Sequence, residues 1–330
     1  MPSAPIHFFA TRKHGVDFSV SNTGWRYGKG NVFSPAPNHP ENKNAETNVQ
    51  SIPEEYKIEN DHPGVILQSR YGKGISEVSH EFLEDATHER DSTGHIVING
   101  DGLFTTMTNV PLLNKSGDAP AIIFEAEQAI GIIVGAWRCL GKDIINLMLD
   151  KFTDLNVNFD QITVFIGPGL GKGSFTLGQA EITILKSVFD NTLDEAVALK
   201  PPKPEKPPKF YIDVVKLMEL YAKSFGFTVN SSEHQDTFNK EPWREMKRTA
   251  LANNDPISPI NYYKNQMYFS ARMYVRADRL ARRIAKKTNS PLPETLAVIP
   301  DTTNYEDLSK ASSRYAETGR CLNGVMRKNG

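Results

Sequence analysis

Three consecutive segments in the middle of the chain most constrain its fold. Residues 129–134 form a nearly continuous apolar run of strand length. After this run, apolar residues recur at spacings of three and four between Leu140 and Phe152, which predicts an amphipathic helix. Residues 161–166 form another apolar strand and end in a Gly-Pro-Gly turn. A strand, a helix and a strand in this order predict a βαβ unit with parallel strands, so we expect an α/β fold.

Weaker patterns extend this prediction toward both ends of the chain. Further strands are expected at 6–12, 65–67, 95–98, 103–106 and 119–124, and further helices around 185–189, 211–225 and 268–287. We expect one α/β domain over 1–285, with insertions at about 20–60, 198–210 and 239–266, and a C-terminal extension over 286–330. The third insertion contains Pro242, Pro256 and Pro259 and is expected to be irregular, and the polar extension is expected to be peripheral.

Composition excludes several classes of function. The chain has 330 residues with 38 Lys and Arg against 39 Asp and Glu, so its net charge of −1 creates no overall attraction for nucleic acid or anionic lipid. No apolar run approaches the roughly 18 residues of a membrane span, and residues 1–15 lack the features of a signal peptide. Two cysteines cannot form a disulfide framework. We therefore expect a cytoplasmic protein without a membrane or nucleic-acid partner.

Two segments outside the strands have more than one interpretation. The Pro- and Lys-rich residues 200–209 predict a stiff exposed loop, or a protein-recognition segment because a Pro-x-x-Pro spacing occurs there. Residues 167–174, Gly-Pro-Gly-Leu-Gly-Lys-Gly-Ser, follow a strand but fail the spacing of a nucleotide phosphate loop. A tight structural turn, which could line a pocket with backbone amides, is the better interpretation.

Two further groups of residues could carry chemistry. Cys139 lies where a strand changes to a helix, beside Trp137 and Arg138, and a helix N-terminus and a cation both lower the pKa of a thiol. The alternative is an inert buried cysteine. The helix-forming segment 272–287 is the densest positive charge in the chain, and predicts a solvated face or a surface for an anion or an acidic partner. The eight histidines show no spacing typical of zinc ligands.

Several segments, read together, match the motifs of one known family in order and spacing. Residues 8–16 resemble its early Phe-Thr-Thr-Arg-x-Gly-Gly-Val, and 101–106 resemble its Asp-Ala-Leu-Val-Thr. Residues 116–124 resemble its Thr-Ala-Asp-Cys-x-Pro-Val-Leu, and 133–139 stand where it has Val-His-Ala-Gly-Trp-Arg-Gly. On these motifs the chain resembles the YfiH family, also called the laccase-domain or polyphenol-oxidase-like family.

The same order continues toward the C-terminus. Residues 164–171 and 175–178 resemble the family's Gly-Pro-x-Ile-Gly and Tyr-Glu-Val-Gly. Its closing Phe-Phe-Ser-Tyr-Arg-Arg is matched by 268–281 or, more weakly, by 314–320. The resemblance implies a layered α/β/α sandwich with mixed sheets, related in fold to the cytotoxic necrotizing factor deamidases.

The resemblance also implies a zinc-dependent purine nucleoside phosphorylase and adenosine deaminase activity, beside an older copper laccase description. In the family a His, a Cys and a second His hold the metal, and the matching positions here are Tyr71, Ala119 and Val134. Methyl and isopropyl groups offer no lone pair, and a phenol is a poor zinc ligand. We therefore expect no bound metal and no cofactor.

The residues around these three positions keep the family's residue types. They are Arg12, Asp118, Trp137, Arg138 and Arg272. Such groups could bind an anion or a nucleoside base by charge-assisted hydrogen bonds and stacking. Alternatively, Asp118 forms a buried pair with an arginine and Trp137 is a core aromatic residue.

Three hypotheses about function follow. The first is a family member that has lost the metal chemistry. It would bind a small molecule, either a nucleoside or an anion, or act as an interaction protein. The second is an enzyme with an altered pocket, such as a hydrolase or deamidase, that uses Cys139 or Asp118 with an arginine and a histidine as base. The third is a protein-partner surface made by the insertion 239–266, the loop 200–209 and the C-terminal extension.

Overall fold

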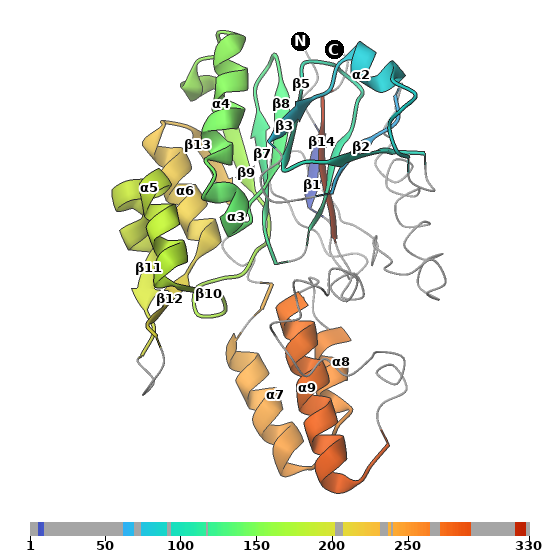
Figure 1. The fold of residues 1–330 in the computed structure, drawn as a ribbon, viewed down its shortest axis with the longest axis vertical. Coiled ribbons are helices and arrows are strands. Elements are labelled where there is room, and N and C mark those ends of the chain that lie inside the picture. Colours follow the sequence, from blue (N-terminus) through green and yellow to red (C-terminus); the bar gives the residue numbers. More distant parts are fainter. Residues whose placement is uncertain are drawn as a thin grey trace.

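The computed structural model describes residues 6–9, 62–68, 74–90, 94–116, 118–201, 207–231, 237–238, 240–264, 271–291 and 321–327. In this part of the chain two main sheets lie face to face, and helices cover the outer face of one of them (Figure 1). A separate group of helices projects from one end of the sheets. The expected class, a layered α/β fold with mixed sheets, is confirmed.

The larger sheet has six strands and contains the segments that the sequence marks as most apolar. Its order is β13 (Thr228–Ser231), β9 (Thr163–Ile166), β7 (Ala121–Glu125), β8 (Ile130–Val134), β5 (Gly102–Thr105) and β3 (Ile75–Glu77). Strand β7 is antiparallel to both β8 and β9. All five residues of β8 are buried, as expected for a strand covered on both faces.

The predicted βαβ unit is present, but its strands are not neighbours. Strand β8 leads through α3 (Trp137–Leu140) and α4 (Ile144–Asp154) to β9. The two strands are parallel, as predicted, but β7 lies between them and pairs with both. The direct pairing of β8 with β9 was therefore wrong, because a preceding antiparallel strand occupies that place.

The second main sheet has five strands and includes the last described segment of the chain. Its order is β1 (Ile6–Phe9), β14 (Cys321–Met326), β6 (Leu112–Ser116), β2 (Val65–Gln68) and β4 (Ile96–Asn99). Strand β14 pairs with β1 on one side and with β6 on the other, and Val325 and Met326 are buried. The expectation that this polar end of the chain is peripheral is therefore wrong for 321–326.

Helices cover the outer face of the six-stranded sheet, and a small sheet packs against one of them, α5. Helix α4 packs on β5 and β8, α5 (Gln179–Ala196) packs on α6 (Val214–Ser224), and α6 packs on β9 and β13. The small sheet has the order β10 (Thr176–Gly178), β12 (Lys209–Ile212) and β11 (Val197–Leu199). The predicted helix 211–225 begins only at Val214, because the Asp213 carboxylate caps it by accepting from the Lys216 N–H. Two short elements, α2 (His80–Glu84) and η1 (Phe159–Gln161), complete this part of the fold.

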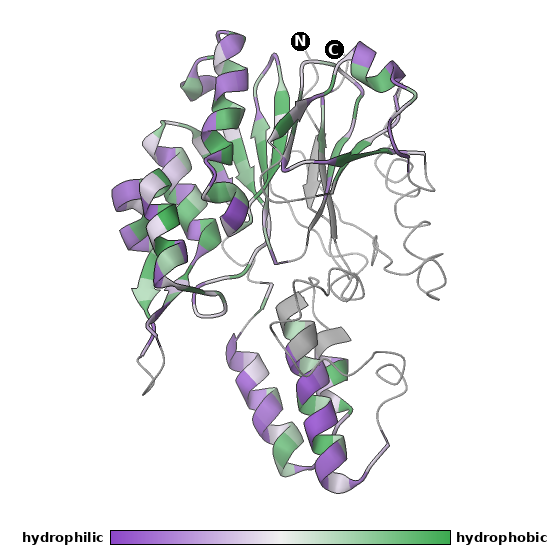
Figure 2. Ribbon diagram, viewed as in Figure 1, coloured by the Kyte–Doolittle hydropathy of each residue, from purple (hydrophilic) through white to green (hydrophobic). Residues whose placement is uncertain are grey.

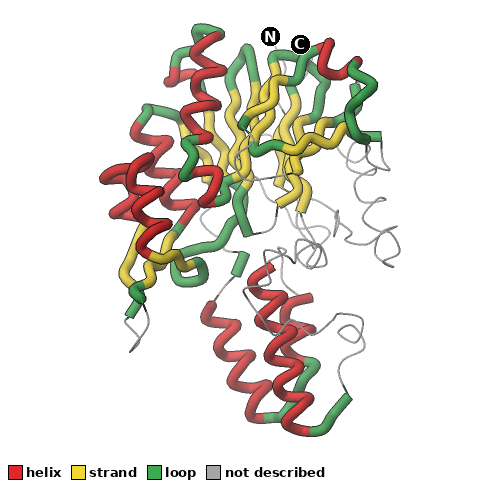
Figure 3. The backbone as a smooth tube through the Cα atoms, viewed as in Figure 1, coloured by secondary structure: helices red, strands yellow, loops and turns green. Residues whose placement is uncertain are grey.

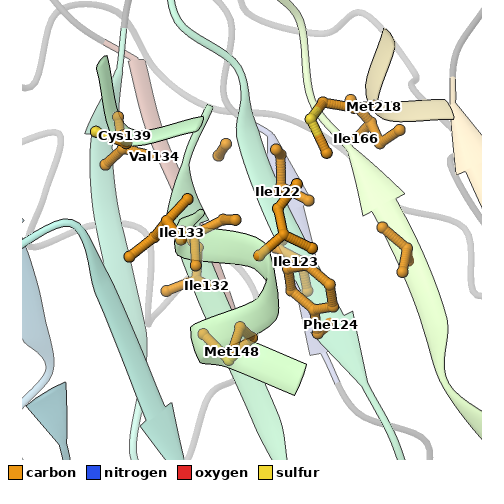
Figure 4. Packing of buried hydrophobic residues seen from close by; sticks show 14 of the residues in the cluster. Ile122, Ile123, Phe124, Ile132, Ile133, Val134, Cys139, Met148, Ile166 and Met218 are labelled. Carbon is orange, nitrogen blue, oxygen red and sulfur yellow. The ribbon is translucent and has the colours of Figure 1, made fainter. Parts of the chain in front are cut away.

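The main core lies between these layers. Figure 4 shows Ile122, Ile132 and Met148 among its close-packed apolar side chains, and all three are fully buried. Phe152 of α4 makes an edge contact with Phe104, with ring centroids 5.2 Å apart. In Figure 2 the strands are mainly hydrophobic, whereas the helices above them alternate between hydrophobic and hydrophilic residues, as amphipathic helices do.

The projecting group consists of three helices, α7 (Lys240–Ala252), α8 (Ser258–Lys264) and α9 (Ala271–Thr288), shown as separate red tubes in Figure 3. The irregular structure expected over 239–266 is therefore wrong for 240–252 and 258–264, which are helical. Pro242 and Pro259 lie in the first turns of their helices. The N–H groups there have no acceptor within the helix, so a proline, which has no N–H, costs no hydrogen bond. Asp255 accepts bonds from the Ile257 and Ser258 N–H groups at the start of α8.

These helices have a second apolar core and an unusual charge. The predicted apolar face of α9 is confirmed, since its apolar residues at helical spacing are buried: Met273, Ala277, Leu280, Ala281 and Ile284. Residues 240–291 contain 12 Lys and Arg but 4 Asp and Glu, a net charge of +8 in a chain of net charge −1. Of the helices in the described residues, none has the length and hydropathy needed to cross a membrane.

Candidate functional site

The positions singled out by the sequence meet at one end of the six-stranded sheet. Asp118 and Ala119 precede β7, Trp137 and Arg138 follow β8, and the glycine-rich turn 167–174 follows β9. Because β7 runs antiparallel to both neighbours, its start lies beside their ends. The fold therefore brings three separate sequence motifs to one edge of the sheet.

Backbone hydrogen bonds hold these three segments together. The Gly135 N–H donates to the Pro120 carbonyl over 2.7 Å, and the Gly167 N–H donates to the Ala121 carbonyl over 2.8 Å. The Leu170 N–H donates to the Asp118 carbonyl over 3.0 Å. Two amides of the glycine-rich turn are thus used inside the protein, which favours the interpretation of this segment as a structural turn.

Two glycines allow the close approach of these segments to Pro120. A Cβ atom on Gly135 would lie 2.8 Å from the Pro120 carbonyl oxygen, and one on Gly169 would lie 2.9 Å from Pro120 Cδ. Both distances are shorter than real Cβ contacts. These glycines are therefore required by packing at this edge.

The Asp118 side chain is held by a residue that the sequence did not single out. Thr237 donates from its hydroxyl to Asp118 Oδ1 over 3.2 Å, and its N–H donates to the Gly169 carbonyl over 2.9 Å. The next residue, Phe238, is fully buried and accepts a hydrogen bond at its carbonyl from the Ser174 hydroxyl over 2.8 Å. Residues 237–238 therefore fasten the glycine-rich turn to the Asp118 segment, and no local pattern in the sequence signals this role.

Two of the three expected metal positions are described, and both carry apolar side chains. Val134 ends β8 and is 5% exposed, and Ala119 packs against the main core. Neither side chain has an atom that can donate an electron pair, so the residues present do not fit the family's zinc site. Tyr71 lies outside the described residues. Among the described residues there is no group of three or more His, Cys, Asp and Glu side chains able to hold a metal ion.

Trp137 and Arg138 form the open part of the site. Arg138 is exposed and its guanidinium carbon lies 5.1 Å from the centroid of the half-buried Trp137 ring, within the range of a cation–π contact. Both residues begin α3, directly after β8. An indole and a guanidinium at the surface supply a flat apolar face and a cation for a planar or anionic ligand.

Cys139 lies in the next position but faces the core. Its side chain is 1% exposed and belongs to the apolar cluster, and Figure 4 shows it near Val134. A thiol buried among apolar side chains is out of reach of a substrate. This placement favours the structural interpretation of Cys139 over the nucleophilic one.

The other predicted residues are placed only in part. Arg12 lies outside the described residues, and Arg272 lies in α9 with its side chain outside the described part. Further along α9, Arg276 lies 4.6 Å from the centroid of the Phe238 ring, and Arg282 donates to Asp278 over 2.8 Å. Part of the basic segment is therefore engaged inside the protein.

The geometry defines a mixed α/β protein with a candidate site at one end of its central sheet, and comparison with known proteins identifies its family and agrees with its fold. The family described as multi-copper polyphenol oxidoreductase laccase matches residues 6–243. The chain therefore belongs to this family, the YfiH family, as the sequence motifs predicted. Among curated proteins, no match to the chain is found.

Three solved structures share the fold at low sequence identity. A hypothetical protein YfiH from Bacillus licheniformis has a TM-score of 0.59 at 13% identity, covering 98% of this chain and 92% of that one. A Neisseria meningitidis protein of the DUF152 family has a TM-score of 0.57 at 14% identity, covering 99% and 96%. YlmD from Geobacillus stearothermophilus has a TM-score of 0.57 at 14% identity, covering 99% and 93%.

Proposed function

We propose that this member of the YfiH family lacks the zinc-dependent purine nucleoside chemistry that its sequence motifs would imply, and acts as a binding protein for a small ligand. The observation that carries the proposal is the pair Ala119 and Val134. Both lie at the sheet edge where the site is built, and neither offers a donor atom. A catalytic zinc needs three protein ligands, and the third position, Tyr71, provides at most one weak ligand.

The remaining residues support binding. Asp118 has an oriented carboxylate, and Trp137 with Arg138 provides an aromatic face beside a cation. The base of a nucleoside could stack on the indole. The ring nitrogens of the base or the hydroxyl groups of the ribose could then form hydrogen bonds with the carboxylate and the guanidinium. The alternative interaction is with a protein partner, through the loop 200–209 or the C-terminal extension. The alternative activity is that of an enzyme with an altered pocket that uses Asp118.

The test combines metal analysis with a nucleoside assay. We expect the purified chain to hold no stoichiometric zinc or copper and to convert neither adenosine nor inosine, with or without added zinc. The matched comparison is the triple variant Tyr71→His, Ala119→Cys and Val134→His, which restores the three donors and should bind zinc. Stoichiometric zinc in the unaltered chain, or turnover of either nucleoside, would show that the proposal is wrong.

A further inference from the structure

A second group of polar residues lies beyond the glycine-rich turn and away from the metal positions. Tyr211 is in β12, the middle strand of the small sheet, Lys200 follows β11, and Lys240 begins α7. The Lys200 ammonium lies 5.4 Å from the centroid of the Tyr211 ring, and the Lys240 ammonium lies 4.8 Å from it. The Lys240 ammonium is also 3.4 Å from the Tyr211 hydroxyl oxygen. Three different elements thus bring two cations to one phenol ring.

The two cations have no opposite charge among their described contacts. Neither ammonium group forms an ion pair with a carboxylate of the described residues. Other lysines of this structure do, since Lys186 pairs with Asp194 and Lys223 pairs with Glu219. Each of the two ammonium groups beside Tyr211 therefore lacks a counter-charge among the described residues, and a bound anion would supply one.

The surroundings add further positive character. Lys240 is the first residue of a 13-residue helix, and the N-terminus of such a helix attracts anions. Gly173 has a φ of +96°, and a Cβ atom there would lie 3.8 Å from Lys240 Nζ, so no side chain separates the ammonium from the turn. The hydrogen bonds of 237–238 to the same turn fix the chain directly before Lys240.

These features select the class of anion. Two ammonium groups and a phenol hydroxyl approach from separate elements, which suits an anion with several acceptor oxygens and more than one charge. A phosphate group has both properties, whereas a carboxylate has one charge and two oxygens. All three groups belong to the surroundings of one tyrosine ring, so they suit a single phosphate better than the extended backbone of a nucleic acid.

We propose that Lys200, Lys240 and Tyr211 form a binding site for a phosphate group, either free phosphate or the phosphate of a small phosphomonoester. Lysine ammonium groups hold the charge, and the Tyr211 hydroxyl donates to a phosphate oxygen. The proposal does not depend on the metal positions. It adds to the proposed function a second site, beside the Gly173 end of the turn 167–174.

The test is calorimetric titration of the full chain with inorganic phosphate, and separately with adenosine 5′-monophosphate and with adenosine. We expect phosphate to bind, and Lys200→Gln and Lys240→Gln each to weaken it by about tenfold, since a charge-assisted hydrogen bond has roughly that effect. Tyr211→Phe should weaken binding less. The matched control is Lys247→Gln, an exposed lysine of the same helix, which should leave the affinity unchanged.

The arms of the experiment separate the outcomes. Tighter binding of adenosine 5′-monophosphate than of phosphate identifies a phosphomonoester ligand, and equal affinities identify free phosphate. If phosphate does not bind, or if Lys247→Gln weakens phosphate binding as much as the site variants do, the site is overturned. Circular dichroism checks that each variant folds. If Lys240→Gln does not fold, Lys200→Gln and Tyr211→Phe still test the site. Failure here leaves the zinc and nucleoside results of the proposed function unaffected.

Discussion

The Thr237 hydroxyl donates to Asp118 Oδ1 over 3.2 Å, although 119 residues separate the two positions. Thr237 is buried and Asp118 is half-buried, so this bond is sheltered from water. It connects the segment before β7 to the segment before α7, and so links the sheet edge to the helical group.

We predict that Thr237→Val lowers the free energy of unfolding by about 1 kcal/mol, because Asp118 loses a partner that the isosteric valine cannot replace. Urea denaturation followed by circular dichroism measures the change. The control is Thr249→Val on the exposed face of α7, which should change stability much less. Equal effects of the two substitutions would show that the bond to Asp118 contributes nothing.

The packing around Pro120 gives a second prediction. Gly135→Ala should destabilise the protein by about 1–3 kcal/mol, because the new methyl group would overlap the Pro120 carbonyl oxygen. Gly100→Ala is the control, since its Cβ would meet its nearest neighbours at 3.6 Å, an ordinary contact distance. Thermal unfolding compares the two variants, and a melting temperature of Gly135→Ala no lower than that of Gly100→Ala would contradict the expected overlap.

The burial of Cys139 predicts slow chemistry at its thiol. Iodoacetamide should label this cysteine at a low rate in the folded protein and rapidly in urea, because the side chain is 1% exposed. Peptide mapping by mass spectrometry measures the rate at this site. Rapid labelling without denaturant would instead indicate an accessible thiolate and would revive Cys139 as a nucleophile.

Asp255 gives a prediction about pH. Hydrogen bonds from the Ser258 hydroxyl and from the Ile257 and Ser258 amides lower the pKa of Asp255 below its ordinary value of 3.8. A carboxyl group with a lowered pKa in the folded state stabilises the protein above its unfolded pKa, and this contribution is lost as the pH falls through the folded value. Asp255→Asn should therefore lower the melting temperature at neutral pH, and the difference should shrink below about pH 4.

Melting temperatures between about pH 7 and about pH 2.5, a range that brackets the ordinary aspartate pKa, measure this difference. Asp150→Asn, an exposed aspartate of α4, is the matched control for the loss of one charge. A difference for Asp255→Asn that stays constant over the whole range would mean that the amide bonds do not depend on the charge.

Strand β14 gives the last prediction. Deleting residues 321–330 should abolish cooperative folding or destabilise the protein severely, because β1 loses its partner, β6 loses one of its two partners, and the buried Val325 and Met326 are removed. The control is the substitution of Lys328 and Asn329 by alanine, which leaves the residues of the strand in place. An unchanged thermal transition after the deletion would show that the five-stranded sheet does not need this strand.

The parts of the fold that the sequence predicts are those specified by local patterns. Residues 130–134 and 163–166 are strands and 144–154 is a helix because their apolar residues repeat at strand or helix spacing, independently of distant partners. The helices α7 and α8 were missed because their prolines suggested interruption, and only the structure shows that two of these prolines lie in first turns.

The site was predictable only where family motifs mark it. Asp118, Trp137 and the glycine-rich turn stand in recognisable motifs, and the sheet places these motifs at one edge. Thr237 and Lys240 gave no signal, because their importance arises from contacts with residues far away in the sequence. Pairings such as Ile6 with Met326 are of the same kind, since no local pattern encodes them.

The position of β14 also determines when the two sheets can form. Every strand of the six-stranded sheet comes from residues 75–231, whereas β6 pairs with β2 on one side but must wait on its other side for β14, about 200 residues further along the chain. Loops of this length close slowly, and proteins rich in such distant contacts fold slowly. During synthesis on the ribosome, the five-stranded sheet would therefore expose an open edge at β6 long after the rest of the core can assemble, and this interval is when the chain is most exposed to aggregation and most in need of a chaperone.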